Sequence, residues 1–114
     1  MEKDDSVYLG HMLDCAFKAV GKVHGRTRAD FDADENLRLA LTHLVQVIGE
    51  AARRVSEATR AAHPQIPWHA IVGMRHKVVH DYLEVSEDIL WEVVTRSLPE
   101  LIRLLSPIVP PEGV

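Results

Sequence analysis

The sequence predicts an all-α protein, an antiparallel bundle of four to five helices. Apolar residues recur at steps of three and four over long stretches, and no stretch of any length alternates as a β-strand would. Hydrophobic residues make up 46% of the chain but aromatic residues only 5%, so Leu, Val, Ile and Ala must form the core. This composition favours helix packing over a β-sandwich. At 114 residues the chain is expected to be a single domain over 1–114, with a frayed, proline-containing tail from 107 to 114.

The first helix is predicted from Asp5 to His24, where Leu9, Leu13 and Val20 belong to one apolar stripe. Gly25 is a plausible C-terminal stop, and the polar stretch 25–32 is predicted to be a loop.

The second helix is predicted to begin at a capping box formed by Asp32 and Glu35. Its apolar residues keep a heptad-like spacing: Leu37, Leu41, Leu44, Ile48, Ala51 and Val55. Val45 and Val47 widen the apolar surface beyond one stripe. A helix that is apolar on more than one side has more than one partner, so we expect a subunit interface as well as a bundle interior.

Prolines and caps divide the second half of the chain. Ser56–Ala62 is expected to form a short extra turn before the prolines at 64 and 67 break the helix. Pro67 suits the first position of a third helix, predicted from Trp68 to about Leu83. Ser86 is predicted to cap a fourth helix, which Pro99 should kink or divide.

Charge is unevenly distributed along the chain. The net charge is −4, yet residues 51–80 hold five Lys or Arg residues, one acidic residue and four of the seven histidines. This segment is either a solvated basic face or a site for an anionic ligand. The single Cys15 excludes an internal disulfide and a cysteine-rich zinc cluster. With no apolar leader at the N-terminus and no apolar run of about 18 residues, we expect a cytoplasmic protein without a membrane span.

The stretch Arg75–Tyr82 (RHKVVHDY) is the candidate site. On an ideal helix Arg75 shares the inward stripe with Trp68 and Ile71, and Trp68 is expected to anchor the helix in the core. A guanidinium on that stripe needs a buried acid such as Glu50, a subunit interface or an anionic ligand.

The histidines of this stretch have two interpretations. His76 and His80 have the i, i+4 spacing of a helical metal-ligand pair, but only Glu84 offers a third ligand. In the second interpretation, a His removes the proton of a ribose 2′-hydroxyl while Arg75 stabilises charge on the phosphate. Arg75 and His80 would lie about 140° apart on one helix, so two copies meeting at a two-fold axis would bring them together more easily.

The run from Ile48 to Leu98 resembles the HEPN superfamily, specifically its HepT-like toxins. The matching text is IGEAARRVSE, then HPQIPWHAIVGMRHKVVHDY, then ILWEVV and LP. The superfamily motif, Arg followed after four to six residues by His, is here Arg75-x4-His80. The HepT extension adds a tyrosine two residues later, here Tyr82. His76 stands where relatives commonly have Asn.

The resemblance implies a metal-independent ribonuclease that acts as a toxin on an RNA substrate and needs no cofactor. It also implies a homodimer, with the active site formed where the two protomers meet. Arg75 and His80 would be catalytic, and His76 would support them. Because relatives commonly have Asn at this position, the resemblance leaves open whether His76 shares the acid–base role or only positions the phosphate. The partner would be a minimal nucleotidyltransferase antitoxin, which in some members adenylylates the motif tyrosine, here Tyr82. An AMP group there would add bulk and negative charge beside Arg75.

Two alternatives remain open at this level. The protein could be a non-catalytic binding subunit that accompanies a nucleotidyltransferase, with the 75–82 face docking that partner. Tyr82 could simply pack at a helix end with its hydroxyl in water.

Overall fold

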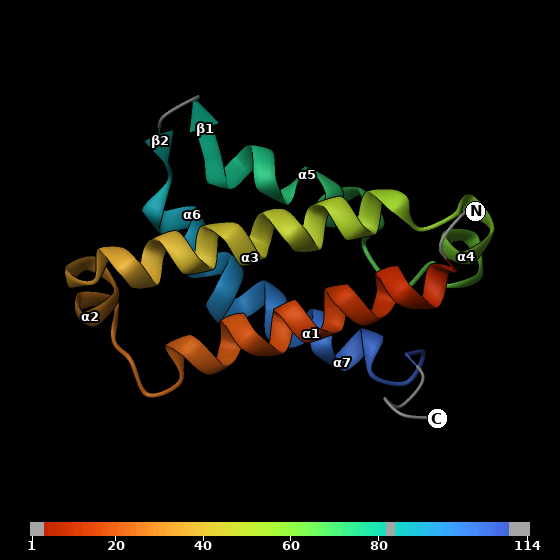
Figure 1. Ribbon diagram of the computed structural model, residues 1–114, viewed down its shortest axis with the longest axis horizontal. Coiled ribbons are helices and arrows are strands. Elements are labelled where there is room, and N and C mark those ends of the chain that lie inside the picture. The colour runs from red at the N-terminus through yellow and green to blue at the C-terminus, as the bar shows by residue number, and fades with distance from the viewer. Residues whose placement is uncertain (1–3, 82–83, 110–114) are drawn as a thin grey trace.

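A computed structural model describes residues 4–81 and 84–109, with residues 75, 79–81 and 84–85 described through their backbone alone. The all-α prediction is confirmed, with one short hairpin added (Figure 1). The elements run in the order α1 (Asp5–Val23), α2 (Arg28–Ala33), α3 (Glu35–Arg54), α4 (Glu57–Ala62), α5 (Trp68–Val78), β1 (Val79–Asp81), β2 (Glu84–Val85), α6 (Glu87–Glu92), the π-helical turn η1 (Val93–Ser97) and α7 (Leu98–Leu105). No described helix is long and apolar enough to cross a membrane.

The connection between the first two long helices differs from the predicted loop over 25–32. It contains α2, because Thr27 and Asp30 form a reciprocal capping box in which each side chain accepts from the other's backbone N–H. The cap of α3 is Asp34, whose side chain accepts from the N–H of Leu37, and not the predicted Asp32. The sequence holds several acidic residues near this point, and the prediction chose the wrong one.

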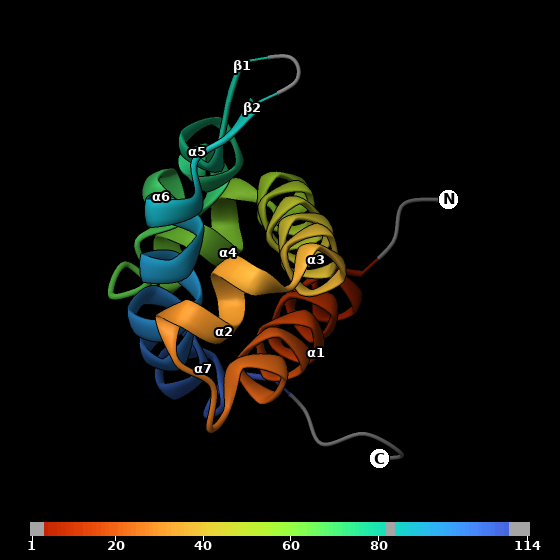
Figure 2. The same cartoon turned by 90° about the vertical axis from the view of Figure 1, so that its left-hand side faces the viewer.

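Helix α3 is the central helix of the bundle. It packs along α1 on one side and α5 on the other, and Figure 2 shows it between them. This arrangement explains its wide apolar surface within one chain, since Val45 is fully buried and Val47 half-buried. The width of that surface is therefore weaker support for a subunit interface than the sequence indicated. Leu39 is the exception among the apolar residues of α3, because 61% of its surface is exposed.

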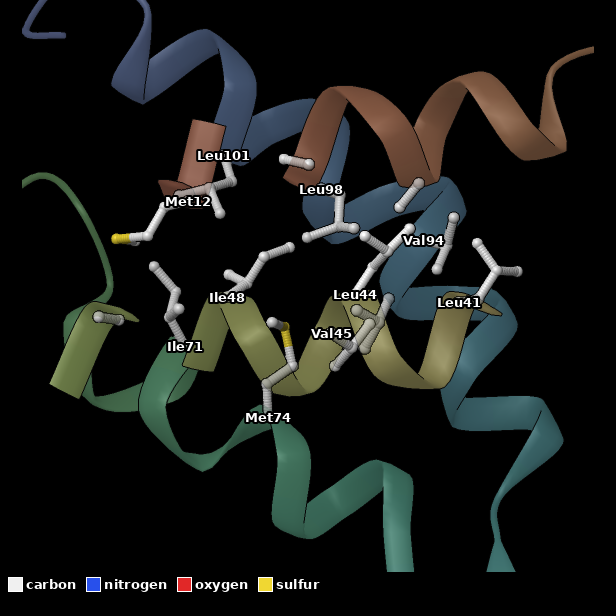
Figure 3. Packing of buried hydrophobic residues seen from close by; sticks show 14 of the residues in the cluster. Met12, Leu41, Leu44, Val45, Ile48, Ile71, Met74, Val94, Leu98 and Leu101 are labelled. Atoms are coloured by element: carbon white, nitrogen blue, oxygen red, sulfur yellow. The ribbon is translucent and has the colours of Figure 1, made fainter. Parts of the chain in front are cut away.

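The core lies where α1, α3, α5, η1 and α7 meet (Figure 3). Side chains from all five elements converge there: Met12, Leu41, Leu44, Val45, Ile48, Ile71, Met74, Val94, Leu98 and Leu101. At about 25 cal/mol per Å² of buried apolar surface, this single cluster is the main source of the bundle's stability.

The third helix ends earlier than predicted. Helix α5 stops at Val78, and the chain continues as β1, which pairs antiparallel with β2 in the register Val79 with Val85 and Asp81 with Glu84. The N–H of Ser86 donates to the carbonyl of Val78 at 2.7 Å, which closes the base of the hairpin. Two adjacent β-branched valines at 78 and 79 favour this change from helix to strand. In Figures 1 and 2 the two strands extend away from the helices.

Ser86 caps α6 as predicted, with its hydroxyl accepting from the N–H of Ile89. Pro99 has its predicted effect through η1, the π-helical turn that precedes it. Since Pro99 has no N–H for the carbonyl of Thr95, the N–H of Leu98 bonds to Val93 five residues back. In the tail, Ile108 and Val109 pack against the core, and residues 110–114 lie outside the described part of the chain.

Candidate functional site

Trp68 fixes the start of α5, the helix that leads into the candidate site. Only 8% of its surface is exposed, and its indole N–H donates to the carbonyl of His63 at 3.0 Å. Helix α5 begins at Trp68, and the N–H of Ile71 donates to the carbonyl of Pro67, so Pro67 precedes the helix by one residue and does not take its first position as predicted. The prediction of Trp68 as a core anchor is confirmed.

Helix α5 has a buried face and a cationic exposed face. Ile71, Met74 and Val78 continue the buried face from Trp68, and Met74 was missing from the predicted stripe. His69, His76 and Lys77 are exposed on the other side. The last turn of α5 therefore presents an imidazole and an ammonium to solvent immediately before the hairpin.

Of the predicted site residues, the structure places the backbones of Arg75 in α5 and His80 in β1. The side chains of both lie outside the described part of the structure, and so does the whole of Tyr82. His80 does not continue the helix of Arg75, so the predicted separation of 140° around one helix is wrong. The catalytic roles of these residues stay predictions.

The i, i+4 metal-ligand geometry of His76 and His80 is also wrong. The segment from His76 to His80 crosses the end of α5 at Val78, so the two histidines do not share a helical face. Among the residues that the structure describes, no three His, Cys, Asp or Glu side chains lie close enough together to hold a metal ion.

The C-terminal end of α3, beside α4 and away from the hairpin, carries a cluster of two arginines around one carboxylate (Figure 1). Arg53 donates to Glu50 through two nitrogens, at 2.8 and 3.2 Å, and Arg54 donates to it at 3.0 Å. These hydrogen bonds lower the pKa of the Glu50 carboxyl to about 2, with that of Arg53 contributing most. Glu50 is therefore ionised at neutral pH and binds both arginines.

The same end of α3 is held in place by a third arginine and by α1. Arg60 donates to the carbonyls of Val55 and Arg53, at 2.9 and 3.0 Å, and so satisfies carbonyls that the end of a helix leaves unpaired. Asp5 at the start of α1 accepts from the N–H and the hydroxyl of Ser56, which lower the pKa of its carboxyl. The positive charges at this end of the molecule thus belong to a fixed scaffold.

One feature near these residues was missed from the sequence. A groove of about 540 Å³ runs between α1 and α3, lined by Tyr8, His11, His43, Gln46, Val47, Glu50, Ala51 and Arg54. The signal was present, because the polar residues of α3 at 43, 46, 50 and 54 recur at steps of three and four. The apolar stripe of the same helix is the stronger pattern, and the prediction for this helix rested on it.

Comparison with known proteins gives a consistent result. The family model for "Ribonuclease HepT-like" matches residues 12–108. A candidate RNase of Caldanaerobacter subterraneus is 37% identical over 82% of this chain and 84% of its own length. A candidate ribonuclease HepT of Thermococcus cleftensis is 33% identical over 63% of this chain and 66% of its own length.

A more distant candidate RNase of Methanocaldococcus jannaschii is 26% identical and covers 95% of this chain and 89% of its own length. No solved structure matches the chain significantly. The family match includes α5, the hairpin and the whole Arg75–Tyr82 stretch. This chain belongs to the HepT-like ribonuclease family.

Proposed function

We propose that this protein is a metal-independent endoribonuclease toxin, silenced by a nucleotidyltransferase antitoxin. The observation that carries the proposal is the family match over residues 12–108, which includes the Arg75-x4-His80-x-Tyr82 motif. The exposed Lys77 on α5, with the exposed imidazoles of His69 and His76, adds support, because RNA binding depends strongly on positive charge near the phosphates.

In the proposed reaction, His80 removes the proton of a ribose 2′-hydroxyl, and the 2′-oxygen attacks the adjacent phosphorus. The bond from phosphorus to the 5′-oxygen breaks, leaving a cyclic phosphate and a 5′-hydroxyl that takes up a proton. Arg75 stabilises the negative charge that develops on the phosphate oxygens. His76 is exposed in the last turn of α5 and is the candidate donor of the leaving-group proton.

We propose a homodimer as the active form, with the site completed where two protomers meet. A two-fold axis would place two copies of each motif at one interface. The support for this dimer is the membership of the family, because a single exposed apolar residue such as Leu39 is common on monomers.

The proposed silencing acts through Tyr82. Transfer of AMP from ATP to its phenolic oxygen would release pyrophosphate and leave a negative phosphodiester close in sequence to Arg75. That charge would compete with an RNA phosphate for the guanidinium. Intact mass after co-expression with the proposed nucleotidyltransferase antitoxin tests this step. An increase of one AMP that maps to Tyr82 and is absent from Tyr82→Phe is expected, and an unchanged mass contradicts it.

The rival function is that of a non-catalytic subunit that binds a nucleotidyltransferase through the 75–82 face. The exposed Lys77, with His69 and His76 on the same helix, suits an acidic protein surface as well as it suits RNA. In that case Arg75→Ala would weaken the complex and leave cellular RNA unchanged.

Induced expression in cells separates the two functions. Wild type is compared with Arg75→Ala, His80→Ala and the matched control His24→Ala, an exposed histidine at the end of α1. We expect growth arrest and RNA fragmentation with wild type and His24→Ala only. Intact RNA in all four cultures, with the protein shown to be unmodified at Tyr82, supports the binding subunit.

A further inference from the structure

The groove between α1 and α3 has the dimensions of a site for an extended ligand. Its α3 wall includes His43, Gln46, Glu50 and Arg54, which lie on one side of the helix because they are three or four residues apart. The eleven steps from His43 to Arg54 span about 16 Å at 1.5 Å per residue. That length matches several nucleotides at the ~3.4 Å rise of a stacked strand.

The opposite wall, from α1, supplies an aromatic ring and a second imidazole. Tyr8 and His11 are three residues apart and both line the groove, Tyr8 half-buried and His11 exposed. A half-buried tyrosine keeps its ring in place while leaving part of it accessible, as base stacking requires. The two histidines therefore lie on opposite walls of the groove, and the tyrosine lies on the wall that carries His11.

The charged residues of the groove, Glu50 and Arg54, lie toward the C-terminal end of α3. Arg54 lines it there, beside Arg53, and both bind the ionised Glu50. Arg54 donates to Glu50 through its Nε, so among the described residues its Nη donors are left to bind a phosphate. Because the groove also has apolar lining from Val47 and Ala51, the arrangement combines apolar surface, an aromatic ring and cations. Proteins that bind single-stranded nucleic acid without reading its sequence use this combination.

We propose that the groove between α1 and α3 binds single-stranded RNA that flanks the cleaved phosphodiester. This inference rests on the proposed ribonuclease function and extends the RNA path beyond the Arg75–His80 motif. Helix α3 lies between α5 and α1 (Figure 2), so an RNA strand that leaves the motif must cross α3 to enter the groove and would then run along it toward Arg54, away from the hairpin. Tyr8 stacks on a base, and Arg54, His11 and His43 bind phosphate oxygens.

Binding of a fluorescein-labelled, 2′-O-methylated single-stranded RNA tests the groove, because this probe cannot be cleaved through a 2′-hydroxyl. Arg54→Ala is compared with Arg103→Ala, a matched control whose exposed guanidinium pairs with Glu100 on α7. Loss of one phosphate contact lowers the slope of log K against log salt by about 0.7 for a single strand. We expect that change for Arg54→Ala and no change for Arg103→Ala.

A second pair of variants tests whether the ring of Tyr8 stacks on a base. Tyr8→Leu keeps apolar bulk in the half-buried position, and we expect RNA binding about fivefold weaker or more, from the ~1–3 kcal/mol of one stacked base. Tyr8→Phe keeps the stacking face and is expected to bind as wild type. On a cleavable RNA, Arg54→Ala and Tyr8→Leu should raise KM and leave kcat unchanged.

Three results would overturn the inference. Wild-type cleavage of RNA together with unchanged binding by Arg54→Ala and Tyr8→Leu overturns the groove alone. Groove variants that shift the sedimentation of the protein from dimer to monomer assign the groove to a second copy of this chain. Wild type that neither binds the probe nor cleaves RNA overturns both the groove and the proposed function.

Discussion

The arginines of two regions of this molecule bind different partners. At the corner between α2 and α6, Arg28 binds Asp32 at 2.8 Å and Asp88 at 2.7 Å, and Arg38 lies 3.4 Å from Glu87. Arg38 also donates to the carbonyl of Phe31. Carboxylates outnumber guanidinium groups among these partners, so the corner holds elements together and has no positive charge left over.

The end of α3 has the opposite balance. Arg53 and Arg54 both bind Glu50, and Arg60 donates to backbone carbonyls. Three guanidinium groups share Glu50 and Asp5, which attracts Arg60 from the start of α1, and the groove between α1 and α3 opens beside them. The number of arginines in a segment therefore does not identify a ligand site. The balance between the arginines and their bound carboxylates is the more informative quantity.

The largest expected effect concerns the corner. The ring of Phe31 is fully buried, 5.1 Å from the ring of Trp91, and the Arg28 guanidinium lies 5.6 Å from its centre. Phe31→Ala should lower the free energy of unfolding by about 3–5 kcal/mol, measured by urea denaturation. Cleavage of RNA per folded molecule should not change. A loss of cleavage greater than the loss of folded protein would show that the corner is not purely structural.

The next effect separates the two regions directly. Only 20% of the Arg38 side chain is exposed, and it donates to the carbonyl of Phe31 at 2.9 Å. Arg38→Ala should destabilise the protein by about 1–3 kcal/mol, because charged hydrogen bonds to partly buried groups are lost. Arg54→Ala, at the end of α3, should change RNA affinity and leave the urea midpoint almost unchanged. A stability loss from Arg54→Ala together with an RNA-affinity loss from Arg38→Ala would contradict the different roles assigned to the two regions.

A smaller effect depends on pH. The folded-state pKa of Glu50 is about 2, below the ordinary value of 4.5, so its ionised form stabilises the fold. That contribution is fully present above pH 4.5 and is lost as pH falls toward 2. The urea midpoint of wild type should exceed that of Glu50→Gln at pH 7, and the two should converge near pH 2. A difference that stays constant over this range would contradict the assigned role of Glu50.

The smallest effect is expected from Asp88→Asn. The carboxylate of Asp88 is 86% exposed, and solvent screens its pair with Arg28. Thermal unfolding should show no measurable shift, because Arg28 keeps Asp32 as a partner. A clear loss of stability would mean that this exposed pair contributes more to the α2–α6 corner than its geometry indicates.

Much of the fold could be predicted from local chemistry. The caps at Ser56 and Ser86, the prolines before α5 and the burial of Trp68 all follow from rules that act over a few residues. The end of α5 could not be predicted, because helix periodicity continues through Val79 and Tyr82 while strand pairing with Glu84 and Val85 determines the conformation.

The candidate site shows the same division. The resemblance selected Arg75, His80 and Tyr82 from sequence spacing, whereas the groove depends on how α1 and α3 pack. Tyr8 and Arg54 lie 46 positions apart in the sequence, so no local pattern unites them. Only the exposed polar residues of α3 gave a signal, and the predicted apolar stripe of the same helix concealed it.

The most direct test of the central claim is cleavage of RNA by purified protein that is unmodified at Tyr82, in the presence of EDTA. Wild type and the matched control His24→Ala should cut single-stranded RNA, whereas Arg75→Ala and His80→Ala should lose activity by about 10²-fold or more. Cleavage that needs a divalent metal, or that survives both substitutions, would contradict the account.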